Sequence, residues 1–406
     1  MKFLLIPGNN SLSHVAKCLA AQEALASRGH QVLIAASRKH VPFLSLFDCQ
    51  HTVLPDIQEA DDGSAPSMAW FRHPDRIRAC IEAEIALLKT YRPDRVLGVF
   101  RFTAKAAAAL CHIPYDALAC GCMMPDNPEV LGFAGNEKGR RHQAQYLDNF
   151  YRFAARKISL ALKPLGCPPI DDIRWMLMGD RTFLWDFPQF MPLPAASNRY
   201  HIGPLRWSRW PGKETCRPSD LNGGRPQALL SFGTRDIGRP RRKVAEKLVN
   251  SLLKRGYAVM IAAGGQPDLM NILPRHPGIR IWPFVPLDRL LEHVALVICH
   301  GGQMTIFESL QRGVPVGVVP FQPEQAHNGV CLERIGCGAR LVPAVAFKGC
   351  ADVYCQALQR LSADRLQAAI RTLTEDPCMD QRLALAANAL RSLSGAPLLA
   401  RLMERN

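Results

Sequence analysis

The chain has 406 residues, of which 48% are hydrophobic and 21% are charged, and its formal net charge is +15 at pH 7. This composition is typical of a folded globular protein and excludes disordered, collagen-like and disulfide-scaffold chains. At about 150 residues per domain, the length predicts two or three domains. No stretch reaches the roughly 20 consecutive apolar residues of a membrane-spanning helix, so we expect no membrane span.

The first half of the sequence alternates apolar strands with amphipathic helices. FLLIP precedes the helical pattern HVAKCLAAQEALASRG, and HQVLIAA follows as a second strand. The alternation continues through RIRACIEAEIALLKTY, DRVLGVF and TAKAAAALCH, which predicts a parallel, doubly wound α/β sheet. The N-terminal apolar run turns at a Pro-Gly pair and lacks the features of a secretory signal. We interpret it as a buried strand and expect a cytoplasmic protein.

The composition changes between residues 200 and 225, where Pro, Gly and Trp are frequent and no period is sustained. Such a stretch is typical of an interdomain linker. A second strand and helix series then runs from ALLSFGT to VPVGVVP. We predict a Rossmann-like domain over residues 1–205, a linker over 206–224, a second Rossmann-like domain over 225–385, and a C-terminal helix over 386–406 that crosses back to the first domain.

Most of the excess positive charge lies after residue 205, and the cysteines lie in apolar stretches. A basic half suits nucleic acid, an anionic membrane surface or a phosphate-bearing ligand, and only motifs distinguish these partners. The cysteines lack the paired CxxC modules of a zinc site, which predicts reduced thiols and no metal centre.

The most informative stretch, VICHGGQMTIFESLQRGVPVGVVPFQPEQAHNG, covers residues 297–329. Its pattern predicts a strand, a Gly-Gly turn, a helix, a second strand and a loop. A Gly-Gly turn after a parallel strand lets the backbone approach a ligand, and the amides of the next helix attract an anion. His300 lies on this turn, Thr305 follows in the helix, and Glu308 lies one turn further, where its carboxylate suits a diol. The pattern indicates a phosphate with a ribose behind it; the alternative is a simple turn with a solvent-facing Glu308.

This stretch resembles the donor-binding signature of nucleotide-sugar-dependent glycosyltransferases of the GT-B fold. That family includes the UDP-glucuronosyltransferases and the plant and bacterial natural-product glycosyltransferases. The similarity extends upstream through SFGT and PFVPLDRLLEHV to HIGPL, and so covers nearly all of the second domain. It implies two Rossmann-like domains in tandem, with parallel sheets that face each other across a cleft.

The resemblance also implies ligand contacts for individual residues of the second domain. No DxD-like pair lies beside a donor strand, so it implies a metal-independent reaction in which a helix dipole and a histidine replace the metal. The implied contacts are the diphosphate for His300, Thr305, the backbone of Gly302 and the turn from Ser231 to Thr234, the base for Phe284 and Val285, the ribose for Glu308, and the sugar hydroxyls for Glu324 and Gln325.

The first domain resembles the family through PGNNSLSHVAKCLAAQEALASRGHQVLIA, in which His14 stands where the family has its general base. Ser13 replaces the glycine that usually precedes this histidine. Many members orient the histidine with an aspartate after a later strand, but VLGVFRFTAKAAAALCHIP contains none. Asp116 and Asp126 are then the candidate partners, and without a nearby carboxylate we expect an ordinary imidazole pKa for His14. The alternative is that His14 is a structural residue.

Together these features predict an inverting glycosyltransferase that moves a sugar from a UDP- or dTDP-sugar to a hydroxyl, with no cofactor beyond this donor. The alternatives are a sugar-nucleotide epimerase of the same fold and a non-catalytic sugar-nucleotide-binding module. No nucleic-acid partner is expected, since an anionic donor accounts for a basic second domain.

The acceptor is predicted to be an apolar small molecule or a lipid. Met, Phe and Trp residues in the stretches 61–74 and 120–133 favour an apolar pocket. The basic stretch 138–163 carries several aromatic residues, which suits peripheral contact with an anionic membrane if the acceptor is a lipid. The sequence indicates no oligomeric state.

Overall fold

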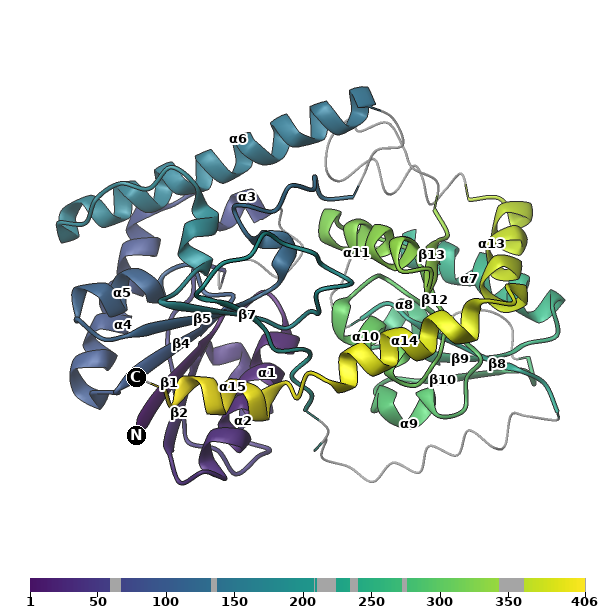
Figure 1. Ribbon diagram of the computed structural model, residues 1–406, viewed down its shortest axis with the longest axis horizontal. Helices are drawn as coiled ribbons and strands as arrows, with labels where there is room; N and C mark the ends of the chain where they lie inside the picture. The colour runs from purple at the N-terminus through teal and green to yellow at the C-terminus, as the bar shows by residue number, and fades with distance from the viewer. Residues whose placement is uncertain are drawn as a thin grey trace. The chain divides into compact units, whose positions relative to one another are not determined.

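The computed structural model describes residues 1–58, 67–132, 137–207, 209, 224–233, 240–271, 276–342 and 361–405. The chain divides into two compact units, each built around its own parallel sheet (Figure 1). The first unit comprises Met1–Pro128, Gln145–Trp207 and Leu393–Asn406, and the second comprises Glu129–Ala144 and Ser208–Ser392.

The first unit has a seven-stranded sheet with the order β3-β2-β1-β4-β5-β6-β7. Its central strand β1 pairs in parallel with β2 on one side and β4 on the other. Because the strand order reverses here, the loops after β1 and β4 diverge at the carboxyl edge of the sheet, where open α/β sheets bind their ligands. The strands are β1 (Lys2–Pro7), β2 (Gln31–Ala36), β3 (His51–Val53), β4 (Arg95–Val99), β5 (Tyr115–Ala119), β6 (Arg181–Leu184) and β7 (Arg199–His201).

Helices connect most of these strands, since parallel neighbours need crossover connections. The first begins after Ser11, whose side chain accepts the backbone N–H of Ser13 at 3.2 Å and so caps the helix. The helices are α1 (Leu12–Ala26), η1 (Arg38–His40), α2 (Val41–Leu44), α3 (Ser67–Trp70), α4 (Pro74–Tyr91), α5 (Ala104–Leu110), η2 (Gly121–Met123), α6 (Glu137–Leu162), η3 (Lys163–Leu165), η4 (Ile173–Leu177) and α15 (Ala396–Met403). Of α6, the part up to Ala144 is counted with the second unit.

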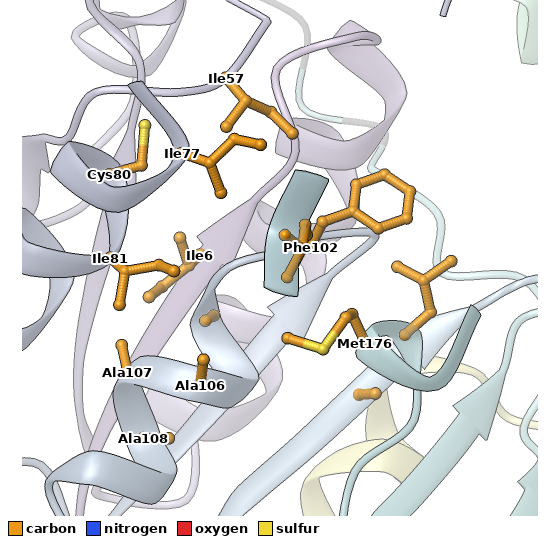
Figure 2. Packing of buried hydrophobic residues seen from close by; sticks show 14 of the residues in the cluster. Ile6, Ile57, Ile77, Cys80, Ile81, Phe102, Ala106, Ala107, Ala108 and Met176 are labelled. Atoms are coloured by element: carbon orange, nitrogen blue, oxygen red, sulfur yellow. The ribbon is translucent and has the colours of Figure 1, made fainter. Parts of the chain in front are cut away.

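The core of the first unit lies between the sheet and helices α4 and α5 (Figure 2). Ile6 of β1 is fully buried and belongs to one apolar cluster with Ile77 and Ile81 of α4. Ala107 of α5 joins the same cluster, and its small side chain lets the helix approach the sheet closely. This packing fixes the strands whose carboxyl ends carry the polar residues described below.

The end of the chain packs on the first unit through α15, which contacts α1. The Glu404 carboxylate accepts hydrogen bonds from the Arg28 guanidinium at 2.5 and 2.6 Å, and its Oε1 lies 2.7 Å from Nε2 of His30. Arg181 of β6 donates to the carbonyls of Leu402 and Arg405, which satisfies acceptors at the end of this helix. These contacts anchor the segment within the unit.

The second unit has a six-stranded parallel sheet with the order β10-β9-β8-β11-β12-β13, so the strand order reverses between β8 and β11. Its strands are β8 (Gln227–Ser231), β9 (Ala258–Ala262), β10 (Ile279–Trp282), β11 (Leu296–Cys299), β12 (Val316–Val318) and β13 (Gly338–Arg340). Its helices are α7 (Pro240–Lys254), α8 (Pro267–Met270), α9 (Leu287–Leu291), α10 (Gln303–Gln311), α11 (Pro323–Arg334), α13 (Ala363–Glu375) and α14 (Met379–Arg391).

One segment of the described residues, Met379–Met403, has the length and hydropathy of a membrane-crossing helix. Within its most apolar window, 44% of the residues are buried. The segment is divided into α14 and α15, and Gly395 at the start of α15 has a φ of +57°. Both halves therefore pack as ordinary amphipathic helices of the fold.

Candidate functional site

The turn after β11 brings the predicted Gly-Gly motif to the carboxyl edge of the second sheet. Gly301 has a φ of +93°, and a Cβ atom there would lie 2.7 Å from the carbonyl oxygen of Gln325. A Cβ atom on Gly302 would lie 2.6 Å from Nε2 of His300. Gly301 requires glycine, because its φ is positive and its neighbour is backbone, whereas a side chain on Gly302 would displace the His300 ring. Gly302 is the N-cap of α10 and offers no side-chain cap, so the first amides of this helix are available to an anion.

His300 is positioned by the neighbouring strand β8. Its backbone N–H donates to the carbonyl of Ser231 at 3.3 Å, and its Nδ1 lies 3.5 Å from the same oxygen. The half-buried ring packs over Gly233, where a Cβ atom would approach it to 3.0 Å. The imidazole therefore lies between the turns after β8 and β11, where it can contact an anion at the start of α10.

Two buried amide side chains, which the sequence analysis did not single out, hold the Gly-Gly turn. Asn328 of α11 is fully buried and its Nδ2 donates to the Gly301 carbonyl at 2.8 Å. Gln303 donates from Nε2 to the Asn328 side-chain oxygen at 3.3 Å. Gln325 accepts the backbone N–H of Phe321 at 2.8 Å, so its oxygen shapes the loop after β12. A polar residue at a buried helical position was the available sequence signal.

The remaining predicted donor residues lie at the same edge or near it. Thr305 is 8% exposed in the first turns of α10, and Glu308 is half-buried one turn later. Phe284 is 57% exposed, and its ring covers the Gly264–Gly265 turn, where a Cβ atom on Gly265 would lie 2.6 Å from it. Such an exposed aromatic face is suited to stacking. Val285 and Glu324 are half-buried, and Thr234 lies outside the described residues.

In the first unit, His14 lies in the first turn of α1 at the carboxyl edge of the sheet. It is 6% exposed, and its Nδ1 lies 3.4 Å from the carbonyl oxygen of Gly8. Because a carbonyl oxygen only accepts, this contact is a hydrogen bond when Nδ1 carries the proton, and Nε2 is then left as an acceptor. The ring centroid lies 5.1 Å from that of Phe100 and 6.0 Å from that of Trp185.

Burial, followed by the nearby charge of Lys17, lowers the pKa of His14 to about 3. This corrects the expected ordinary imidazole pKa, because desolvation disfavours the imidazolium. Lys17 lies one turn further along α1, is 3% exposed, and donates from Nζ to the Ser13 carbonyl at 3.4 Å. His14 is therefore neutral at pH 7, the form that a general base requires.

The two aspartates suggested as partners of His14 are bound to arginines instead. Asp116 is fully buried in the first half of β5, and its oxygens accept from Arg95 at 3.0 Å and from Arg181 at 2.8 and 3.0 Å. Asp126 accepts from Arg199 at 2.6 Å. The predicted role of these carboxylates is therefore wrong, since both are used in structural ion pairs.

The apolar residues that suggested an acceptor pocket belong mainly to the core. Trp70, Phe71 and Met124 are buried in the cluster of the first unit, while residues 61–66 lie outside the described part of the chain. The aromatic residues Phe150 and Phe153 of α6 also pack against this cluster. Peripheral membrane contact therefore stays a prediction based on charge alone.

A buried ion network occupies the loops at the carboxyl edge of the first sheet. Arg101, in the loop after β4, donates from Nε to Glu84 at 2.7 Å and from Nη2 to the Pro55 carbonyl at 2.7 Å, and its Nη1 pairs with Asp56. Asp56 in turn accepts the backbone N–H of Asn9 at 2.9 Å. The sequence analysis missed this network; charged residues directly after apolar strands were the available signal.

Residues 240–396 match the C-terminal domain of glycosyltransferase family 28. The PGL/p-HBAD biosynthesis rhamnosyltransferase of Mycobacterium bovis (strain BCG / Pasteur 1173P2) is 26% identical over 357 residues, which cover 84% of this chain and 76% of that protein. These matches confirm the predicted resemblance to natural-product glycosyltransferases.

Two solved structures share the whole fold. The glycosyltransferase of kitacinnamycin superposes with a TM-score of 0.74 at 20% identity, over 100% of this chain and 98% of that one. The spinosyn rhamnosyltransferase in complex with thymidine diphosphate gives a TM-score of 0.70 at 17% identity, over 100% of both chains. These likenesses confirm the predicted α/β GT-B fold.

Proposed function

We propose that this chain, which is a glycosyltransferase of the GT-B fold, inverts the anomeric carbon of a nucleotide sugar as it transfers the sugar to an acceptor hydroxyl. The observation that carries this proposal is the neutral imidazole of His14, whose Nε2 is left as an acceptor at the carboxyl edge of the first sheet. A base at that edge removes the proton of the attacking hydroxyl.

The reaction is a direct displacement. As the acceptor oxygen forms its bond to the anomeric carbon, Nε2 of His14 takes the hydroxyl proton. The bond from the anomeric carbon to the phosphate oxygen breaks, and the nucleoside diphosphate leaves with the electron pair. Attack opposite the leaving group inverts the configuration, and a single base is sufficient for it.

The second unit is proposed to hold the donor at the edge that carries α10. The first amides of α10, with His300 and Thr305, attract the diphosphate and stabilise the charge that develops as it leaves. We assign the exposed ring of Phe284 to the nucleotide base of the donor and the half-buried carboxylate of Glu308 to its ribose. The further assignments are Val285 with the nucleotide base, Gly302, Ser231 and Thr234 with the diphosphate, and Glu324 and Gln325 with the sugar.

The donor is proposed to be a dTDP-linked 6-deoxyhexose rather than a UDP-sugar. The similar mycobacterial protein is named a rhamnosyltransferase, and the similar spinosyn enzyme was solved with thymidine diphosphate.

For the acceptor we propose an apolar small molecule, because the rings of Phe100 and Trp185 lie beside the proposed general base His14. The similar spinosyn enzyme was also solved with its aglycone, which supports an aglycone as the acceptor. The described cysteines are free thiols, which supports a reducing compartment such as the cytoplasm.

The proposal is tested by incubating the purified protein with dTDP-rhamnose or UDP-glucose and a pool of apolar aglycones that bear hydroxyls. We expect equimolar release of thymidine diphosphate and glycoside, and a product whose anomeric configuration, determined by NMR, is opposite to that of the donor. A product with retained configuration would refute the displacement mechanism. Donor conversion without an acceptor would indicate an epimerase, and binding without turnover would indicate a binding module. Activity in excess EDTA tests the expected metal independence.

A further inference from the structure

We infer that the backbone carbonyl of Gly8, in place of a carboxylate, orients His14, and that the buried Asp56–Arg101 pair holds this carbonyl in position. The inference deepens the proposed function and rests on His14 as the base. In the described part of the chain, the Gly8 oxygen is the one hydrogen-bond partner of the imidazole, at 3.4 Å from Nδ1. Catalytic hydrogen bonds are often long in the absence of substrate.

The loop that carries this carbonyl is fixed on both sides. The backbone N–H of Gly8 donates to the carbonyl of Val99 at 2.8 Å, which ties the loop after β1 to the end of β4. A Cβ atom on Gly8 would collide with the carbonyl oxygen of Phe100. Phe100 itself has a φ of +51°, which is rare for a bulky residue and marks a tightly determined turn. The hydrogen bond to Val99 and the close approach to Phe100 therefore leave the Gly8 carbonyl little room to move.

On the other side, the next residue is held by a buried carboxylate. The backbone N–H of Asn9 donates to Oδ2 of Asp56 at 2.9 Å, and the Asn9 side-chain oxygen accepts from the Ser37 hydroxyl. The Asp56 side chain is 2% exposed, so its charge needs a partner. Arg101, whose side chain is 3% exposed, supplies that partner. Because Arg101 compensates the buried carboxylate of Asp56, this carboxylate can accept the backbone N–H of Asn9 and hold the loop after β1 in place.

This arrangement explains why no aspartate follows β4. The loop after β4 contributes a cation, Arg101, and the carboxylate comes from the segment after β3 instead. Asp56 reaches His14 through the backbone of Asn9 and Gly8, so it acts as a positioning residue. A neutral carbonyl fixes the Nδ1–H tautomer and the ring orientation. It does so without adding a negative charge that would raise the pKa of the base.

The test is the tautomer of His14, measured by NMR on protein labelled with ¹⁵N in its histidine rings and assigned with His14→Gln. We expect the Nδ1–H tautomer in the unmodified protein. In Asp56→Ala, we expect both tautomers to be populated and kcat to fall by about 10- to 100-fold with the KM for the donor within about twofold, since misplacement of a catalytic group costs rate rather than donor affinity.

Asp116→Ala is the matched control, because Asp116 is an equally buried carboxylate that binds two arginines in the same unit but does not contact the loop after β1. It should lower the melting temperature and leave the His14 tautomer and kcat unchanged. An Nε2–H tautomer in the unmodified protein would overturn the inference. So would a folded Asp56→Ala that keeps both the tautomer and kcat.

If Asp56→Ala does not fold, Asp56→Asn replaces it with the same expected direction, and the spectrum of the unmodified protein still decides. The proposed function fails separately. If His14→Ala retains transfer activity, His14 is not the base, whatever tautomer it adopts.

Discussion

Nζ of Lys17 lies 4.4 Å from the centroid of the Trp185 ring, so a buried cation stands on an aromatic face one helical turn from His14. The ring offsets part of the cost of burying this charge. The charge in turn opposes protonation of the imidazole. Lys17 therefore helps to keep the proposed base in its neutral form.

The first prediction concerns the pH profile. With the pKa of His14 lowered to about 3, first by burial and then by Lys17, the base is neutral above that pH, and activity should fall only on acidification toward it. Lys17→Met should raise the pKa and move this acid limb to higher pH, while Lys17→Arg should preserve it. The pH dependence of kcat/KM measures both. An acid limb at an ordinary imidazole pKa in the unmodified protein would show that His14 is solvated during turnover.

The second prediction concerns His14 itself. His14→Ala should lower kcat/KM by about 10²- to 10⁴-fold, the usual effect of losing a general base. The Kd for thymidine diphosphate, measured by calorimetry, should be unchanged because the nucleotide is assigned to the second unit. Full transfer activity in a folded variant would exclude His14 as the base. Lost nucleotide binding would point to a structural role.

The third prediction concerns the ribose. Glu308→Ala should weaken nucleotide binding by about 1 to 3 kcal/mol, because a hydrogen-bonded partner is removed without replacement. Glu246→Ala is the control: this carboxylate lies on α7, where it pairs with Arg242 at 2.8 Å. Calorimetric titration with thymidine diphosphate compares the two variants. Equal affinities of the two variants for thymidine diphosphate would show that Glu308 does not bind the nucleotide.

The fourth prediction concerns the nucleotide base of the donor. Phe284 stacks on a nucleotide base in the proposed site, and loss of such stacking costs about 1 to 3 kcal/mol. Phe284→Ala should therefore weaken nucleotide binding, and Phe284→Trp should restore it, while the melting temperature of the free protein stays nearly constant because the ring is already 57% exposed. An alanine variant with undiminished nucleotide affinity would contradict the assignment.

The fifth prediction concerns the anchoring of the chain end. Hydrogen bonds first from Arg28 and then from His30 lower the pKa of Glu404 to about 2. Its contribution to stability is therefore present above the ordinary glutamate pKa and is lost as the pH falls from there toward 2. Glu404→Gln should lower the melting temperature near neutral pH but not at the acid end of this window. Salt should reduce the difference, since Arg28 is partly exposed.

The sequence by itself determined the fold and the donor-side motif. The alternation of strands and helices predicts parallel sheets because each element's apolar period reflects the face that it buries. The Gly-Gly turn and the start of α10 were predictable for a similar reason. Close backbone approach requires glycine, and the proposed anion site consists of backbone amides that are placed there once the turn forms.

Only the tertiary structure decided the surroundings of His14. Asp56 and Arg101 are 45 residues apart, and they meet because the segment after β3 and the loop after β4 end at the same edge of the sheet. The pattern of either segment alone does not specify such a pair. Burial likewise depends on everything packed around a side chain, so an imidazole that reads as ordinary in the sequence has its pKa lowered to about 3 in the folded unit.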